Sequence, residues 1–141
     1  MIEERTTFTV GEEAIMARLV SDDDIKTFAR ISGDDNPVHM NDDYARGTMF
    51  GGRIAHGMLV AGLISAVLGT KLPGPGAIYM SQQLRFLAPV RPGDQVTARA
   101  RVTDWNPEKG RVTLSTDVTN QEGSIVIEGE ARLVMSSYLK R

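Results

Sequence analysis

The chain contains the stretch Met58-Leu59-Val60-Ala61-Gly62-Leu63-Ile64-Ser65-Ala66-Val67-Leu68-Gly69-Thr70, whose part up to Leu68 is its longest apolar run. The segment is apolar around the whole circumference of a helix, which is typical of a helix inside a domain rather than on its surface. It is shorter than the roughly 20 residues that a bilayer requires. We therefore expect a buried central helix. One face of this helix has only small side chains, so a sheet or another helix can approach it closely. These residues are Ala61, Gly62, Ser65, Ala66 and Gly69.

Four segments after Gly76 change to a period of two, which is the spacing of a β-strand with one buried face. The alternating residues are Ile78, Met80, Leu84 and Phe86; Val96, Ala98, Ala100 and Val102; Val112, Leu114 and Val118; and Ile125, Ile127, Gly129, Ala131, Leu133 and Met135. The stretches between them, 89–94, 106–110 and 120–123, have the residues and lengths of turns between antiparallel neighbours. With an N-terminal strand over 15–20, the sequence predicts an α+β fold in which an antiparallel sheet of at least five strands packs on a long central helix.

A second helix is predicted to begin after Ser21. This serine can accept a hydrogen bond as an N-cap, and the acids Asp22, Asp23 and Asp24 favour the positive end of the helix dipole. The helix should run to about residue 31, and a glycine at 33 should stop it. Its apolar positions with helical spacing are Ile25, Phe28, Ala29 and Ile31.

The segment from Gly33 to Gly52 is rich in Asp, Asn, Pro and Gly, so we expect an ordered loop with one helical turn near 42–46. Loops of this length in small domains are usually functional or disordered. The apolar elements on both sides argue against disorder. We therefore expect the functional site in this loop.

The composition restricts the class of protein. The 141 residues suit a single domain over 1–141, and 41% hydrophobic and 24% charged residues are typical of a globular protein. The net charge of -2 and the scattered basic residues disfavour nucleic acid as a partner. Cysteine is absent, which fits a reducing compartment, and the charged first five residues lack the apolar core of a signal peptide. We expect a cytoplasmic protein with no membrane partner.

The two histidines of the chain, His39 and His56, both lie in or beside the long loop. Histidine gains or loses a proton near neutral pH, and Asp34, five residues before His39, supplies a carboxylate that can reach the same pocket. The pair Asn36-Pro37 should impose a bend that directs both side chains to one side. The loop thus carries an acid and a base that can act together.

Three motifs of this chain resemble the MaoC-like, R-specific enoyl-CoA hydratases. The run Gly33-Asp34-Asp35-Asn36-Pro37-Val38-His39 matches the G-D-x-N-P-x-H signature of that family. Residues 54–59, Ile-Ala-His-Gly-Met-Leu, look like the start of the family's central helix, and residues 86–94 look like its strand and turn. The resemblance implies a hot-dog fold and a homodimer that pairs edge to edge.

The resemblance also implies roles for single residues in the hydration of an acyl-CoA substrate, with no cofactor. Asp34 and His39 would hold and activate one water, the Gly57 N–H would bind the thioester oxygen, Ser65 would support the carboxylate and Asn36 the bend. This suits the chemistry, because an enolate develops on the carbonyl oxygen while a base is needed at C3. Syn addition would give the R-3-hydroxyacyl product.

Two other functions are consistent with such a fold. A hot-dog acyl-CoA thioesterase usually has an acid on or near the central helix, but residues 58–70 contain neither Asp nor Glu. A non-catalytic acyl-CoA-binding domain would not need to retain both Asp34 and His39. The acyl chain length and the metabolic pathway stay open, and so does the effect of Asn41, where relatives often carry an acid.

The remaining polar residues near the loop favour structural interpretations. His56 is expected to orient the loop. A metal site built from Asp34, His39, Asp42 and His56 would fit no standard zinc or calcium spacing, so we expect none. Three arginines are either surface residues or contacts to coenzyme A phosphates. These are Arg46, Arg53 and Arg85.

Overall fold

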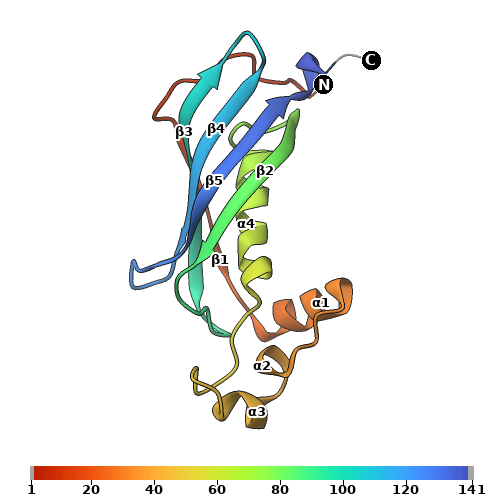
Figure 1. Ribbon diagram of the computed structural model, residues 1–141, viewed down its shortest axis with the longest axis vertical. Coiled ribbons are helices and arrows are strands. Elements are labelled where there is room, and N and C mark those ends of the chain that lie inside the picture. The colour runs from red at the N-terminus through yellow and green to blue at the C-terminus, as the bar shows by residue number, and fades with distance from the viewer. Residues whose placement is uncertain (1, 140–141) are drawn as a thin grey trace.

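The protein is built on one antiparallel sheet of five strands, as the computed structural model shows for residues 2–139 (Figure 1). The strands are β1 (Glu13–Leu19), β2 (Ala77–Phe86), β3 (Gln95–Asn106), β4 (Arg111–Thr119) and β5 (Ile125–Met135), in the order β1-β3-β4-β5-β2. The expected antiparallel sheet is confirmed. The expected domain over 1–141 also includes Met1, Lys140 and Arg141, which lie outside the described residues.

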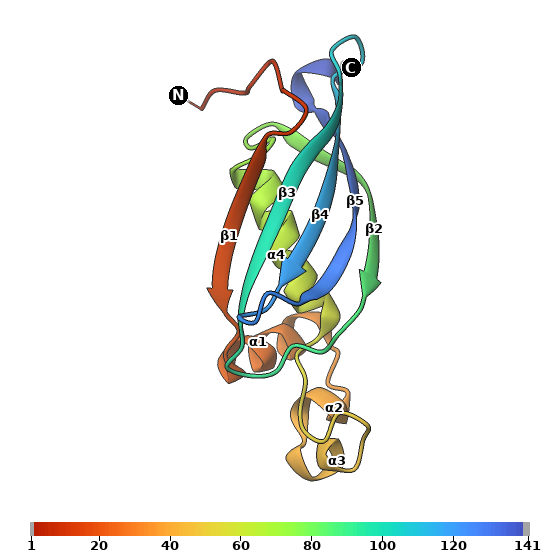
Figure 2. The same cartoon turned by 90° about the vertical axis from the view of Figure 1, so that its left-hand side faces the viewer.

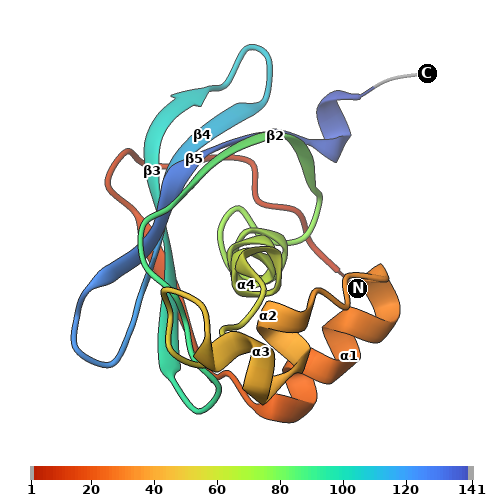
Figure 3. The ribbon, with the colours of Figure 1, turned by 60° about the horizontal axis from the view of Figure 1, so that its bottom comes forward.

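The central helix α4 (Gly57–Thr70) lies in the hollow of the curved sheet, which wraps around it (Figure 3). Its larger side chains, Val60, Ile64, Val67 and Leu68, are buried, because they fill the space between the helix and the sheet. On the sheet side, the predicted inward residues of β3 and β4 are fully buried. These are Val96, Ala98, Ala100, Val102, Val112, Leu114 and Val118.

The expectation that α4 is buried all round is wrong for this chain by itself. Gly62, Ser65 and Gly69 on the small-residue face are exposed. The sheet covers only one side of the helix, and that side takes the large side chains because small ones would leave cavities there. Gly62 and Ser65 of the small-residue face instead border an open pocket beside the edge strand β2.

Strand β2 departs from the predicted pattern in two ways. A bulge between Tyr79 and Ser81 interrupts its pairing with β5, so that Tyr79 rather than Ile78 lies opposite the core residue Leu133. The stretch 89–94 is also not a turn between neighbours, because β2 pairs with β5 whereas β3 lies between β1 and β4. It instead runs from β2, at one edge of the sheet, to β3, which lies next to β1 at the other edge.

Three helices precede α4 in the chain, and Figure 2 shows α2 and α3 projecting beyond the end of the sheet. Helix α1 (Asp22–Ser32) has the predicted N-cap, with Asp24 N–H donating to Ser21 Oγ at 3.0 Å, and it ends at Gly33 with φ of 80°. Helix α3 (Asp42–Arg46) is the predicted turn. A 3-10 turn, η1 (Ser136–Tyr138), follows β5. The inward position expected for Ile31 is wrong, since this side chain is 79% exposed.

Helix α2 (Pro37–Met40) was not predicted as a helix. Asn36 caps it, with Val38 N–H donating to the Asn36 side chain at 3.1 Å, and Pro37 occupies the first turn. Proline suits that position because its fixed φ is helical and its missing N–H would have no partner there. The expected bend at Asn36-Pro37 is thus the start of a helical turn that carries His39. Among residues 2–139, no helix is both long and apolar enough to cross a membrane.

Candidate active site

The ring of His39 is held by a hydrogen bond to the backbone. Its Nδ1 lies 2.8 Å from the carbonyl oxygen of Ile54, and its side chain is 9% exposed. A carbonyl can only accept, so Nδ1 carries the proton in this contact. In the neutral ring, Nε2 is therefore a hydrogen-bond acceptor and a base.

Asp34 is held through its backbone carbonyl and through one carboxylate oxygen, which leaves the other carboxylate oxygen available. His56 Nε2 lies 2.8 Å from the carbonyl oxygen of Asp34, and the Asn36 N–H donates to Asp34 Oδ1 at 3.3 Å. The His56 ring also packs on the His39 ring, with centroids 3.9 Å apart. These two contacts of His56 are those expected of a residue that orients the loop. The side chain of Asp34 is exposed.

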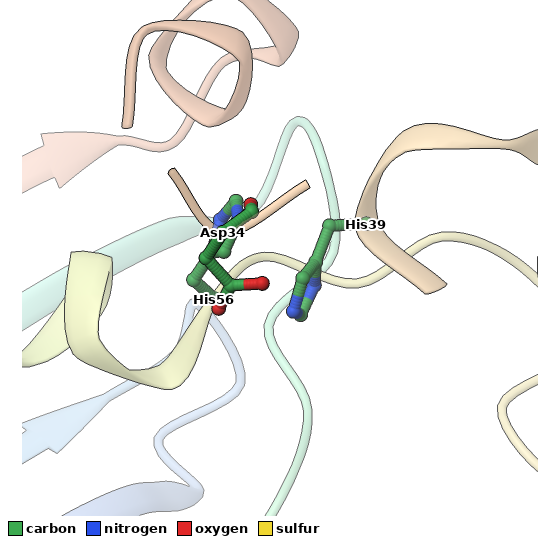
Figure 4. A group of neighbouring side chains, drawn as sticks. All are labelled: Asp34, His39 and His56. Atoms are coloured by element: carbon green, nitrogen blue, oxygen red, sulfur yellow. The ribbon is translucent and has the colours of Figure 1, made fainter. Parts of the chain in front are cut away.

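The side chains of Asp34 and His39 meet at one point. A carboxylate oxygen of Asp34 and a ring nitrogen each of His39 and His56 lie within 4.8 Å of one another. Figure 4 shows the Asp34 carboxylate turned toward the His39 ring. Two hydrogen bonds of about 2.8 Å each can span such a separation, so one water can bind to Asp34 and His39 at once.

The backbone N–H of Gly57 lies at the first turn of α4, beside these side chains. No acceptor for this N–H is found among residues 2–139. The N-terminus of a helix of 14 residues carries a partial positive charge, which strengthens the N–H as a donor to an anionic oxygen. A Cβ on Gly57 would lie 2.6 Å from Phe86 Cε1, so any larger residue would require the Phe86 ring to move.

Asp34, His39 and Gly57 line a single pocket of about 500 Å³. Most of its other residues are apolar and come from the loop before α4, the first turn of α4, and the chain after β2. They are Met49, Phe50, Ile54, Ala55, Met58, Val60, Phe86, Leu87, Ala88, Pro89, Val90 and Ile127, together with His56. An apolar pocket with few polar groups at one end suits an acyl chain attached to a polarised carbonyl.

Ser65 does not lie at this site within the chain. It lines a separate pocket of about 380 Å³ between α4 and β2, together with Tyr79 and Leu84. Eight residues separate it from Gly57, which is a rise of about 12 Å along a helix. Its expected support of the Asp34 carboxylate is therefore not made within one chain. Asn36, in contrast, has the expected place, since it caps the helical turn of His39.

Each arginine that was considered for coenzyme A has an acidic partner in the structure. Arg46 pairs with Asp43, and Arg85 lies 3.3 Å from Glu128. Arg53 is 16% exposed and pairs with Asp22 at 2.6 Å and Asp42 at 2.8 Å. Sequence reasoning missed this network, since its members are distant along the chain.

The ion pairs around Arg53 shift the pKa values of the Asp22 carboxyl and of the Arg53 guanidinium. Hydrogen bonds from Lys26 and Arg53 hold the pKa of the Asp22 carboxyl below its usual value. Asp22 and Asp42 raise the pKa of the Arg53 guanidinium. Both shifts favour the charged forms of Asp22 and Arg53.

A metal ion would have to use Asp34, His39 and His56, since Asp42 is not part of that group of potential ligands. His39 Nδ1 and His56 Nε2 are bonded to backbone carbonyls, and the two rings are tilted by 31° to each other. The expectation that this site holds no metal ion stays a prediction.

The fold and the site together define a hot-dog domain with an acid and a histidine beside the N-terminus of its central helix. Residues 6–124 match the model of the MaoC like domain, and the chain belongs to this family.

Relatives with known names support this placement. The chain is 57% identical over 125 residues to the (R)-specific enoyl-CoA hydratase of Rhodospirillum rubrum, covering 89% of this chain and 86% of the relative. It is 48% identical over 122 residues to the 3-hydroxybutyryl-CoA dehydratase of Methylorubrum extorquens, covering 86% and 77%. The structure of the (R)-hydratase from A. caviae involved in PHA biosynthesis has a TM-score of 0.89 and 38% identity, over 93% of this chain and 99% of that one.

Proposed function

We propose that this protein is an (R)-specific enoyl-CoA hydratase, a hydro-lyase that adds water reversibly to trans-2-enoyl-CoA to give (R)-3-hydroxyacyl-CoA. One observation carries the proposal: Asp34, His39 and Gly57 line one apolar pocket, and the bond of His39 Nδ1 to the Ile54 carbonyl leaves Nε2 as the accepting nitrogen of that ring. The names of the relatives support it and describe both directions of one reaction, hydration and dehydration.

In the proposed reaction, Asp34 and His39 hold one water and take its proton as the oxygen bonds to C3. The electrons of the C2–C3 double bond move toward the carbonyl oxygen, where the Gly57 N–H stabilises the enolate. The proton taken from water then passes to C2. Water thus supplies both the hydroxyl and the hydrogen, on one face of the double bond, and no cofactor is needed.

The thioesterase alternative would usually place an acid on or near the central helix. Helix α4 contains no Asp or Glu, and the acid near its N-terminus comes from the loop. The non-catalytic alternative does not explain why a base and a carboxylate meet in the pocket. Neither alternative has an observation in its favour.

Incubation with crotonyl-CoA separates the three functions. We expect the absorbance of the conjugated enoyl thioester to fall without release of free thiol. Thiol release would point to a thioesterase. Binding with no change in either signal would point to a non-catalytic domain.

The Gly57→Ala variant is expected to lower kcat/KM for crotonyl-CoA at least about 10-fold, because the new methyl group obstructs the approach of the substrate to the oxyanion donor. The added Cβ would also meet the Phe86 ring at 2.6 Å. Gly47→Ala, at the end of α3 and outside the pocket, is the matched control, since Gly47 has a φ of -82° and a Cβ there would make only an ordinary contact of 3.5 Å with the Tyr44 carbonyl oxygen. Equal kinetics of the two variants would contradict the role of Gly57.

We further propose that the enzyme is a cytoplasmic homodimer that pairs through β2. This strand is one edge of the sheet and exposes the large apolar side chains of Ile78, Tyr79, Met80 and Phe86. An apolar edge strand favours pairing with another strand. Pairing there would also cover the exposed small-residue face of α4. The absence of cysteine suits the cytoplasm.

Sedimentation of the wild-type protein should give the mass of two 15.4 kDa chains. Met80→Glu is expected to shift the equilibrium to monomer, because it places a charge on the exposed β2 edge, where Met80 is 54% exposed. The control is Ile15→Glu on the opposite edge strand β1, where the residue is also 54% exposed. If Ile15→Glu were a monomer and Met80→Glu a dimer, the interface would lie at β1, which would contradict pairing through β2.

A further inference from the structure

Arg53 joins three helices around the catalytic loop. Its Nε donates to Asp42 Oδ1 at 2.8 Å, and its NH1 group donates to Asp22 Oδ1 at 2.6 Å. The same NH1 group donates to the backbone carbonyl of His39 at 3.2 Å. Asp22 is the first residue of α1 and Asp42 the first residue of α3. One guanidinium therefore connects both helices to the last turn of α2.

Helix α2 depends on such contacts because it has only four residues. An isolated helical turn is unstable in water, and the last carbonyls of a helix have no partners within it. Arg53 supplies the partner for the carbonyl of His39. The next residue, Ile54, donates its N–H to the Val38 carbonyl at 3.2 Å and accepts the His39 ring N–H at 2.8 Å.

Two consecutive residues thus fix both the backbone and the ring of His39. If the α2 turn shifts, the distance between His39 Nδ1 and the Ile54 carbonyl changes, and the ring loses the bond that selects its tautomer. Nε2 would then no longer be the fixed acceptor in the pocket. The ion pairs of Arg53 beside the pocket are thus connected to the choice of which His39 nitrogen carries the proton.

We propose that Arg53 is a positioning residue of the hydratase reaction, which holds His39 in the Nδ1–H tautomer with Nε2 facing the substrate. The proposal rests on the proposed function. Arg53 acts through its charge and its planar geometry, since two of its nitrogens contact three partners at once. It touches neither the substrate pocket nor the reacting atoms.

The test compares Arg53→Met with Arg18→Met. Arg18 also pairs with an acid of α1, Asp24 at 2.7 Å, but no hydrogen bond from Arg18 to α2 is found among residues 2–139. For Arg53→Met we expect kcat for crotonyl-CoA to fall at least about 10-fold with KM within about 3-fold, because displacement of a catalytic group by about 1 Å is enough for such a loss. Arg18→Met should keep the wild-type kcat.

The second readout is the tautomer of His39, measured by ¹⁵N NMR of the imidazole nitrogens without substrate. The wild-type protein and Arg18→Met should show the Nδ1–H form, and Arg53→Met should show a mixture of tautomers. Unchanged kcat in Arg53→Met, an unchanged tautomer, or the same losses in Arg18→Met would each overturn the proposal. A wild-type protein without hydratase activity would refute the proposed function, while the NMR result would still decide whether Arg53 fixes the ring.

Arg53→Lys provides the test if Arg53→Met does not fold. A lysine keeps the charge, but its single ammonium group cannot reproduce the geometry of the guanidinium. We expect a folded protein with kcat at least about 3-fold below wild type and a partial change of the His39 tautomer. Wild-type values in both measurements would show that charge alone suffices, which contradicts the geometric role.

Discussion

Asp34→Asn is expected to lower kcat for crotonyl-CoA hydration by at least about 100-fold, as the loss of a general acid or base typically does. Asparagine has nearly the same shape and can still accept the Asn36 N–H, so the loop should keep its conformation. It cannot take a proton from water at neutral pH. The loss should therefore appear in turnover while the protein stays folded, as measured by steady-state kinetics and circular dichroism.

The matched control for this variant is Asp35→Asn. Asp35 is the next residue and is also exposed, but it does not line the pocket. It should retain wild-type kinetics. Near-normal turnover of Asp34→Asn, or an equal loss in Asp35→Asn, would remove Asp34 from the proposed chemistry.

His39→Ala is expected to cost at least about 100-fold in kcat, because it removes the nitrogen that binds and activates water. The change also removes the ring that packs on His56. His39→Asn separates the two effects: its amide can donate to the Ile54 carbonyl in place of Nδ1–H but offers no basic nitrogen. Both variants should lose turnover, and thermal unfolding should show His39→Asn as the more stable. A His39→Asn protein with wild-type kcat would exclude His39 as the base.

Much of the fold could be predicted because local patterns determine it. Strands β3 and β4 alternate strictly, with Val96 to Val102 facing the core, and α1 has a serine cap at one end and Gly33 at the other. The order of the strands is not a local property. The sequence around 89–94 looks like a hairpin turn, yet β2 and β3 are not neighbours, since pairing is decided by contacts across the whole sheet.

The site could be predicted where one short motif carries it. Asp34 and His39 lie within one loop, and Gly57 opens an unmistakably apolar helix. Ser65 lines a different pocket within one chain, so its support of the Asp34 carboxylate stays a prediction. The role of Arg53 could not be predicted from the sequence, since its partners Asp22 and Asp42 come together only in the folded protein.

The central claim is that one water, held by Asp34 and His39 on one face of the substrate, supplies both the hydroxyl group and the hydrogen that are added. Hydration of crotonyl-CoA in D₂O, followed by stereochemical analysis of the product, tests this most directly. The account predicts (R)-3-hydroxybutyryl-CoA with one deuterium at C2 on the same face as the new hydroxyl. Anti addition, an S or racemic product, or free thiol would contradict it.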